Sequence, residues 1–266
     1  MKIPLYQVDA FTSRVFGGNP AAVCPLEEWL DDTTLQGIAL ENNLSETAFF
    51  IDRGDHFDLR WFTPAAEVEL CGHATLASAH LLWEGGRVPP DHDIHFETRF
   101  RGALVCRRDG ADGAILMDFP ADPAEPVAPP PGLVERLGVR AVAVGRSRYD
   151  WIVELENEAE VLEARPDFPS LAEFDTRGVA ITARASRAGF DFVSRFFAPR
   201  LRIDEDPVTG SLHCVLGPYW AERLGREELH AFQASSRGGA LQLRLRGDRV
   251  ELGGHAVTIA RGELVA

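Results

Sequence analysis

The sequence lacks the features that mark membrane and secreted proteins. It contains no run of about 18 apolar residues, which argues against a membrane-spanning helix. The first nine residues, MKIPLYQVD, hold no apolar stretch of the length found in signal peptides. Cysteine is scarce, and its four copies show no paired metal-type spacing and are too few for a disulfide scaffold. We therefore expect a cytoplasmic protein with reduced thiols, no membrane partner and no metal site.

Positive charge is also in short supply. Lys and Arg number 27 against 41 Asp and Glu, which gives a formal net charge of -14. Nucleic-acid binding needs clustered cations, so this deficit argues against a nucleic-acid partner. It does not exclude a small anionic substrate, because one local group of backbone N–H donors can outweigh a distant field. With 45% hydrophobic and 26% charged residues, the composition is that of an ordinary globular protein.

The sequence carries no cofactor motif. Neither a G-x-S-x-G nucleophile turn nor a G-x-x-x-x-G-K-[ST] phosphate loop is present. His80 and His213 are isolated in the sequence. The expected chemistry therefore rests on side chains alone, without a cofactor.

A proline-rich segment divides the chain near its midpoint. Residues 121–132, ADPAEPVAPPPG, contain five prolines, which excludes a helix or a central strand there. A chain of 266 residues is long for a single core. We predict two half-domains, 1–120 and 133–266, joined by this linker.

The two halves repeat the same landmarks. RWFTP at 60–64 resembles RFFAP at 195–199, and seven residues after each proline stand Cys71 and Asp206. A turn of small residues and a helical pattern follow in each half. The distance from Pro64 to Arg101 is 37 residues and that from Pro199 to Arg237 is 38. This agreement indicates a duplicated unit.

Most of each half reads as strand, with one helix rich in small residues. Alternating or clustered aromatics at 57–62 and 190–196 are typical of strands. Residues 25–43 read as a further helix with an imperfect apolar face. We predict an α+β fold in which each half is a curved sheet wrapped around one buried helix.

The starts of the two small-residue helices are candidate binding sites for a carboxylate. The first N–H groups of a helix lack internal partners and carry partial positive charge. The residues placed there are small or polar: Gly72, His73, Thr209, Gly210 and Ser211. The alternative is that Thr75, Thr209 and Ser211 are ordinary N-cap residues. Two such starts at equivalent places favour the binding interpretation.

Cys71 and Asp206 introduce these helices and could face one another across a cleft between the halves. Either group can carry protons when its pKa is shifted toward neutrality. The alternatives are that Cys71 is a small buried apolar residue and that Asp206 only caps the chain before Pro207. His73 could donate a second proton or orient the ligand, although a lone histidine is more often structural. Asn19 follows two glycines in a tight loop, where a ligand role competes with a simple turn.

Glu46 is the main candidate for proton transfer. A charged residue before an apolar strand is often just a solvated strand end. Counting back 18 residues from each proline, however, places Ile181 where the first half has Glu46. The repeated scaffold therefore does not require this carboxylate, and such an asymmetry in a duplicated frame suggests function. In a partly dry cleft a glutamate can take and return a proton.

These stretches together resemble the PhzF-like family of phenazine-biosynthesis proteins. The matching segments run in order along the chain: DAF at 9–11, GGNPA at 17–21, NLSETAF at 43–49, RWFTP at 60–64, ELCGHAT at 69–75, DFP at 118–120 and EDPVTGS at 205–211. The resemblance implies a fold similar to that of diaminopimelate epimerase, with two half-domains, each a barrel-like sheet around a central helix. It also implies a site between them, and relatives of this kind often form homodimers.

The resemblance further implies an isomerase in which Glu46 moves a proton between carbons of a small carboxylate substrate. Gly72, His73, Asp206 and Ser211 would line the site. Diaminopimelate epimerases use two cysteines, whereas this chain has Cys71 at one such place and Asp206 at the other, which argues against a two-thiol racemase. Phenazine-pathway members tend to carry a different residue at the position of Cys71, so the phenazine precursor is not the expected substrate.

Two other functions stay open on the sequence. One is an amino-acid racemase or epimerase that uses Cys71 together with Glu46 or Asp206. The other is a non-catalytic metabolite-binding or interaction module that retains the fold without the chemistry.

Overall fold

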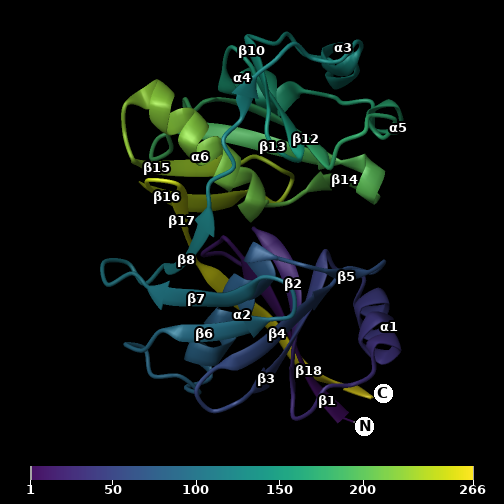
Figure 1. Ribbon diagram of the computed structural model, residues 1–266, viewed down its shortest axis with the longest axis vertical. Coiled ribbons are helices and arrows are strands. Elements are labelled where there is room, and N and C mark those ends of the chain that lie inside the picture. Colours follow the sequence, from purple (N-terminus) through teal and green to yellow (C-terminus); the bar gives the residue numbers. More distant parts are fainter. Residues whose placement is uncertain (1, 266) are drawn as a thin grey trace. The chain divides into compact units, whose positions relative to one another are not determined.

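The computed structural model describes residues 2–265, which form two compact units (Figure 1). One unit runs to Asp118 and takes up the chain again at Gly253, and the other is Phe119–Leu252. The division differs from the predicted boundaries at 120 and 133. The C-terminal segment belongs to the first unit because its strand pairs with the N-terminal strand from Lys2↔Val265 to Ala10↔Ala256. The proline-rich segment belongs to the second unit, where Glu125 and Pro126 pair with Arg146 and Gly145.

The first unit is a sheet with two helices. Its strands are β1 (Lys2–Ala10), β2 (Asn19–Leu26), β3 (Glu46–Asp52), β4 (Phe57–Phe62), β5 (Glu67–Val68), β6 (Ile94–Thr98), β7 (Gly102–Arg108), β8 (Ile115–Pro120), which runs past the boundary, and β18 (Ala256–Val265). Its helices are α1 (Asp32–Asn42) and α2 (Gly72–Glu84). The strands pair in the order β18, β1, β2, β3, β4, β6, β7, β8.

The second unit has its own sheet and shorter helices. Its strands are β9 (Glu125–Pro126), β10 (Ala143–Arg146), β11 (Asp150–Glu154), β12 (Gly178–Arg184), β13 (Phe192–Ala198), β14 (Ile203–Asp206), β15 (Glu228–Gln233), β16 (Gly239–Arg246) and β17 (Arg249–Gly254). Its helices are α3 (Leu133–Leu137), α4 (Glu158–Glu163), α5 (Phe168–Leu171), the 3-10 turn η1 (Pro199–Leu201) and α6 (Gly210–Leu224).

The two sheets repeat one pairing scheme. From β1 to β7 through β2, β3, β4 and β6, successive pairs are antiparallel, parallel, antiparallel, parallel and antiparallel. The series from β10 to β16 through β11, β12, β13 and β15 has the same alternation. Side chains repeat as well: Arg60 forms a two-pronged ion pair with Glu67, and Arg195 does the same with Glu205. The predicted pair of similar half-domains is confirmed.

Each sheet encloses one long helix. In α2 the buried positions run from His73 to Ala79 without a break and continue at Leu81–Trp83, so this helix is covered on all sides. In Figure 1 it lies among the strands of the first unit, and it contacts β1, β2, β3 and β18. A surface helix would show one polar face. Small residues such as Ala74, Ala77 and Ser78 allow the strands to approach it closely. The predicted central helix is confirmed here, and α6 is its counterpart in the second unit.

The helix predicted over residues 25–43 is shorter in the structure. Pro25 and Leu26 complete β2, and α1 begins only at Asp32. Asp31 sets this start because its side chain accepts a hydrogen bond from the Thr34 N–H, which satisfies one of the unpaired donors of the first turn. Among residues 2–265 no helix has the length and apolar character needed to cross a membrane.

Strand register corrects the predicted counterpart of Glu46. Thr47 pairs with Phe62, and in the second unit Val179 pairs with Phe197. Since Phe62 and Phe197 each lie two residues before the matched prolines, the position of Glu46 corresponds to Gly178 and not to Ile181. The predicted equivalence was wrong because a count along the chain ignores the different lengths of the two turns. The asymmetry itself remains, since the scaffold carries a carboxylate in one half and no side chain in the other.

Gly178 has a packing reason to lack a side chain. A Cβ added there would lie 2.2 Å from the ring of Phe196, which is buried. We expect Gly178→Ala to lower the free energy of unfolding by about 1–3 kcal/mol, because the ring must move within a closed core. Urea denaturation measures the change. Gly37→Ala in α1 is the matched control, since nothing lies within 4 Å of its added Cβ. Equal stability of Gly178→Ala and wild type would contradict this packing account.

Candidate functional site

A tight loop places Asn19 at the start of β2. Gly18 has φ +62°, and a Cβ there would lie 2.0 Å from the carbonyl oxygen of Ala10, so only glycine fits. Asn19 follows directly and is fully buried. It lies two residues before Ala21, which pairs with Glu46 of the neighbouring strand. The structure therefore brings Asn19 to the end of the sheet where Glu46 lies.

Glu46 is the first residue of β3, and the end of helix α1 directly precedes this strand. Helix α1 closes at Asn43, which has left-handed geometry (φ 48°) and donates its N–H to the carbonyl of Ala39. β3 begins three residues later. The Glu46 side chain is 16% exposed, so its carboxylate is mostly withdrawn from water yet reachable.

Cys71 is the N-cap residue of α2. Its backbone is extended, and its side chain makes no capping hydrogen bond. Its carbonyl accepts bonds from the Thr75 N–H at 3.2 Å and from the Thr75 hydroxyl at 2.6 Å. Thr75 is thus an internal helix residue and not an N-cap. The N–H groups of Gly72 and His73 precede the first internal bond, which leaves them suited to a ligand anion.

His73 connects Cys71 with Glu46. Its Nδ1 lies 3.5 Å from Cys71 Sγ, and its Nε2 lies 3.2 Å from Glu46 Oε2. Cys71 and His73 are both 6% exposed. One imidazole therefore bridges a thiol and a carboxylate that come from different elements. We call these three residues, Glu46, Cys71 and His73, the acid/base cluster.

Burial sets the protonation state of the imidazole. It lowers the pKa of His73 to about 3, because the charged form loses its hydration without full compensation. His73 is therefore neutral near pH 7, with one nitrogen as donor and the other as acceptor. With the proton on Nε2 facing the Glu46 carboxylate, Nδ1 can accept from the Cys71 thiol. The cluster can hold and pass a proton without carrying a buried cation.

The predicted site residues of the second unit lie at or next to the start of α6. Thr209 is its N-cap, and Gly210 and Ser211 form the first turn. The Thr209 hydroxyl donates to Asp206 Oδ2. His213 Nδ1 lies 2.8 Å from the Thr209 carbonyl, which repeats the Thr75 contact with Cys71. By helix position the counterpart of Cys71 is therefore Thr209, and Asp206 stands three residues earlier, at the end of β14.

Two residues near the start of α6 were not predicted from the sequence. Gln233 is fully buried; its side chain accepts from the Thr209 N–H at 2.9 Å and donates to the Asp206 carbonyl at 2.8 Å. Arg177 donates to Ser211 Oγ at 2.9 Å and pairs with the buried carboxylate of Asp150. Gln233 ends β15 and Arg177 precedes β12, so neither lies near the motif in sequence. The repeat offered one signal: Gln233 follows Phe232 as Glu97 follows Phe96.

The structure thus assembles two groups of predicted residues. In the first unit Glu46, Cys71, Gly72 and His73 lie together, with Asn19 at the same end of the sheet. In the second unit Asp206, Thr209, Gly210 and Ser211 lie together. The shared cleft between the half-domains stays a prediction. The sequence spacing did not indicate a metal site, but the acid/base cluster places a carboxylate, a thiol and an imidazole within 4.8 Å of one another.

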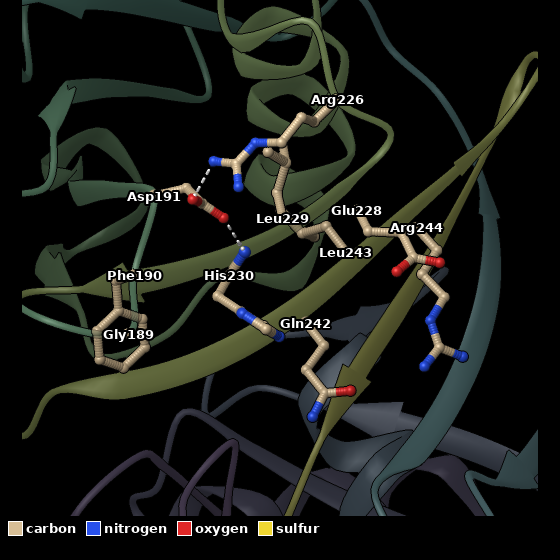
Figure 2. A pocket seen from close by; sticks show the side chains of 10 residues that line it. All are labelled: Gly189, Phe190, Asp191, Arg226, Glu228, Leu229, His230, Gln242, Leu243 and Arg244. Atoms are coloured by element: carbon tan, nitrogen blue, oxygen red, sulfur yellow. Dashed lines mark hydrogen bonds and ion pairs between the residues drawn. The ribbon is translucent and has the colours of Figure 1, made fainter. Parts of the chain in front are cut away.

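A separate hollow of about 380 Å³ in the second unit contains none of the predicted residues (Figure 2). Two of its charged residues, Asp191 and Arg226, pair with each other, whereas Arg244 pairs with Glu251 and Glu228 with Arg246 outside the lining. Asp191 contacts the Arg226 guanidinium and accepts from the His230 N–H at 2.8 Å. Because these charged groups already have ion-pair partners, the hollow is a weaker candidate for chemistry than the acid/base cluster.

Comparison with known families gives one match along almost the whole chain. The profile of the family described as "Phenazine biosynthesis-like protein" (PhzC-PhzF) matches residues 8–262. A curated isomerase of Halalkalibacterium halodurans is 47% identical over 266 residues, covering 100% of this chain and 99% of the relative. A human phenazine biosynthesis-like domain-containing protein is 39% identical over 296 residues and is covered completely, as is this chain.

Solved structures agree with this match. A PhzF-family protein of Enterococcus faecalis superposes with a TM-score of 0.94 at 43% identity, covering 100% of both chains. A hydroxyproline epimerase from Agrobacterium vitis superposes with a TM-score of 0.63 over 99% of this chain and 92% of its own, at 10% identity. The second likeness shows a shared fold only, and it confirms the predicted epimerase-like architecture.

Proposed function

Because the chain belongs to the phenazine biosynthesis-like (PhzC-PhzF) family and is an isomerase like its curated relatives, we propose that Glu46 moves a proton within a small carboxylate-bearing metabolite. The observation that carries this proposal is the 3.2 Å contact of the Glu46 carboxylate with buried, neutral His73 at the start of α2. A proton carrier needs a reachable carboxylate in a partly dry environment, and Glu46 has both properties.

The proposed reaction has two proton transfers. The Glu46 carboxylate removes a proton from an activated carbon of the substrate, and the electron pair moves into the adjacent unsaturated system. The protonated Glu46 then returns the proton to a different carbon, and the double bond moves accordingly. Through their N–H groups Gly72 and His73 hold the substrate carboxylate, where the N-terminal field of α2 favours negative charge. In this scheme Glu46 and the substrate account for the proton and the electron pair, so the proposed reaction uses no cofactor.

The second group of residues has a binding role in this proposal. Gly210 and Ser211 offer N–H donors to an anionic group of the substrate at the start of α6. Asp206 is a second proton-carrying carboxylate, held by the hydroxyl of Thr209. Asn19 contributes a buried amide near the first group.

A second function is favoured by one specific contact. The Cys71 thiol lies 3.5 Å from His73 Nδ1, so the thiol has a base within reach. An amino-acid racemase or epimerase could use Cys71 together with a carboxylate. Inactivation by iodoacetamide, with protection by a bound carboxylate ligand, would favour this alternative.

A carboxylate screen in D2O tests the isomerase proposal. Small carboxylates that raise the melting temperature are incubated with the enzyme, and their deuterium content is followed by NMR. We expect at least one ligand to be converted, with deuterium appearing in its product. Ligands that stabilise the protein but never isomerise or exchange would instead support the non-catalytic binding module.

The cysteines indicate the cellular compartment in which the enzyme works. All four are buried within the two units and lie outside any disulfide bond. Burial raises the pKa of Cys24 to about 12, so this thiol is unreactive. Buried cysteines outside disulfide bonds suit a reducing environment, and we place the enzyme in the cytoplasm.

A further inference from the structure

The acid/base cluster combines three kinds of metal ligand. Glu46 offers a carboxylate oxygen, His73 an imidazole nitrogen and Cys71 a sulfur, and these atoms lie within 4.8 Å of one another. They come from the start of β3 and the first turn of α2, two elements that pack together in the first unit. The cluster therefore rests on rigid secondary structure rather than on a loop.

The donor set selects among metal ions. Zn²⁺ is bound by thiolate, imidazole and carboxylate groups, and a site with three protein ligands leaves a fourth position open. Mg²⁺ and Ca²⁺ prefer oxygen ligands in larger number, which this cluster does not offer. A thiophilic divalent cation is thus the matching ligand.

The spacing of the donor atoms is close to that of a tetrahedral site. Bonds of about 2.0–2.3 Å to Zn²⁺ place neighbouring donor atoms roughly 3.3–3.7 Å apart. The Glu46 Oε2 to His73 Nε2 distance is 3.2 Å. The widest pair, at up to 4.8 Å, must close by roughly 1 Å, which a rotation of the Cys71 side chain can supply.

The surroundings of His73 Nε2 also suit a metal. Nε2 is fully buried, and beyond the Glu46 carboxylate it has no hydrogen-bond partner. Nε2 binds an ion through its lone pair, and the ring proton is then carried by Nδ1. The partly exposed Glu46 provides the route by which an ion reaches the cluster.

We propose that Glu46, Cys71 and His73 form a binding site for Zn²⁺ and that the bound ion reversibly blocks the isomerase. The metal takes up the carboxylate lone pairs of Glu46, so that this group can no longer remove a proton from the substrate. The Cys71 sulfur binds as the thiolate and releases its proton to water. The blocking part rests on the proposed function of Glu46, whereas the binding part does not.

Co²⁺ is the probe for the binding part, because its visible and near-ultraviolet absorption reports coordination geometry and thiolate ligation. We expect one Co²⁺ per chain, with a thiolate charge-transfer band and the visible bands of a four-coordinate ion, displaced by one equivalent of Zn²⁺. Cys71→Ser should abolish the thiolate band and weaken binding by about 100-fold or more, since a direct ligand matters at least as much as its supporting partners. A thermal melt of this variant checks that it is folded.

Cys106→Ala is the matched control. It removes another buried thiol of the first unit, on β7, and should leave the Co²⁺ spectrum unchanged. Mg²⁺ and Ca²⁺ should not displace the probe. Saturation that requires millimolar Co²⁺, or a spectrum that Cys71→Ser leaves intact, would overturn the site.

Proton exchange measured with and without Zn²⁺ tests the blocking part. Exchange should fall as Zn²⁺ is added and return on addition of EDTA. A Zn²⁺-loaded enzyme that exchanges at the normal rate would overturn the block. Since the Co²⁺ spectrum needs no turnover, an enzyme that binds the metal but never catalyses exchange would overturn the proposed function alone.

Discussion

Replacing Glu46 by Gln is expected to lower the rate of substrate proton exchange by roughly 10²–10⁴-fold. The amide has the same size and can still hydrogen-bond to His73, but it cannot accept a proton and return it. Substrate binding should change little, because the N–H groups of Gly72 and His73 hold the carboxylate independently of residue 46. The loss should therefore appear in kcat, with KM largely preserved.

Glu69→Gln is the matched control for this experiment. Glu69 also precedes α2 but is exposed, and it pairs with Arg101 on the surface. Its replacement should leave exchange near the wild-type rate, because surface ion pairs contribute little. Exchange by the Glu46 variant at the wild-type rate would remove Glu46 from the mechanism and direct attention to Cys71 or Asp206.

Acid is expected to destabilise the protein well above the pH at which carboxylates titrate. Burial lowers the pKa of His73 to about 3 and that of His213 to about 4, from an ordinary value of 6.5. Below pH 6.5 the unfolded chain binds protons at both residues, whereas the folded chain does not until much lower pH. The stability from these two neutral imidazoles is therefore complete above pH 6.5 and declines as the pH falls toward the folded values.

Urea denaturation between pH 7.5 and pH 5 measures this effect. We expect the free energy of unfolding to drop by roughly 2–4 kcal/mol over this range, from two groups at about 1.4 kcal/mol per pH unit. His213→Gln should remove about half of the slope. His92→Gln should leave it unchanged, because His92 is exposed. A flat profile for the wild type would show that these histidines are protonated in the folded protein.

The repeated landmarks predicted the fold because each one marks a packing requirement. Arg60 stacks on Phe62 and pairs with Glu67, and Arg195 stacks on Phe197 and pairs with Glu205. These residues make equivalent contacts in the two sheets, which accounts for the same residue types at matched places in the two halves. The small residues of α2 likewise follow from its position inside the strands. Packing requirements of this local kind can be predicted from a single sequence.

The strand registers and the helix boundaries were harder to predict from the sequence. The equivalence of Glu46 with Ile181 assumed turns of equal length, but the two strands instead align Glu46 with Gly178. Counting from the prolines also matched Cys71 with Asp206, whereas the helix starts match Cys71 with Thr209. Counting residues from the prolines does not allow for the 3-10 turn η1. This turn makes the segment between the matched proline and the long helix longer in the second unit than in the first.

Contacts between distant segments were missed for a related reason. Cys71 and His73 were named because they share one motif, but the approach of Glu46 to His73 depends on how β3 packs against α2. Gln233 and Arg177 reach the start of α6 from strands far away in sequence. No periodicity reports such a contact, because one buried hydrogen bond leaves no repeated pattern.

The central claim is that one carboxylate, Glu46, both removes and returns the proton. A carboxylate converted in the screen is labelled with deuterium at the carbon that loses its hydrogen, and a single turnover is run in ordinary water. Direct transfer by Glu46 predicts product with deuterium at the new carbon after one turnover. A separate reaction that runs for many turnovers should give product with a lower deuterium content. Product from the first turnover without any deuterium would contradict the account and indicate that a different group delivers the proton.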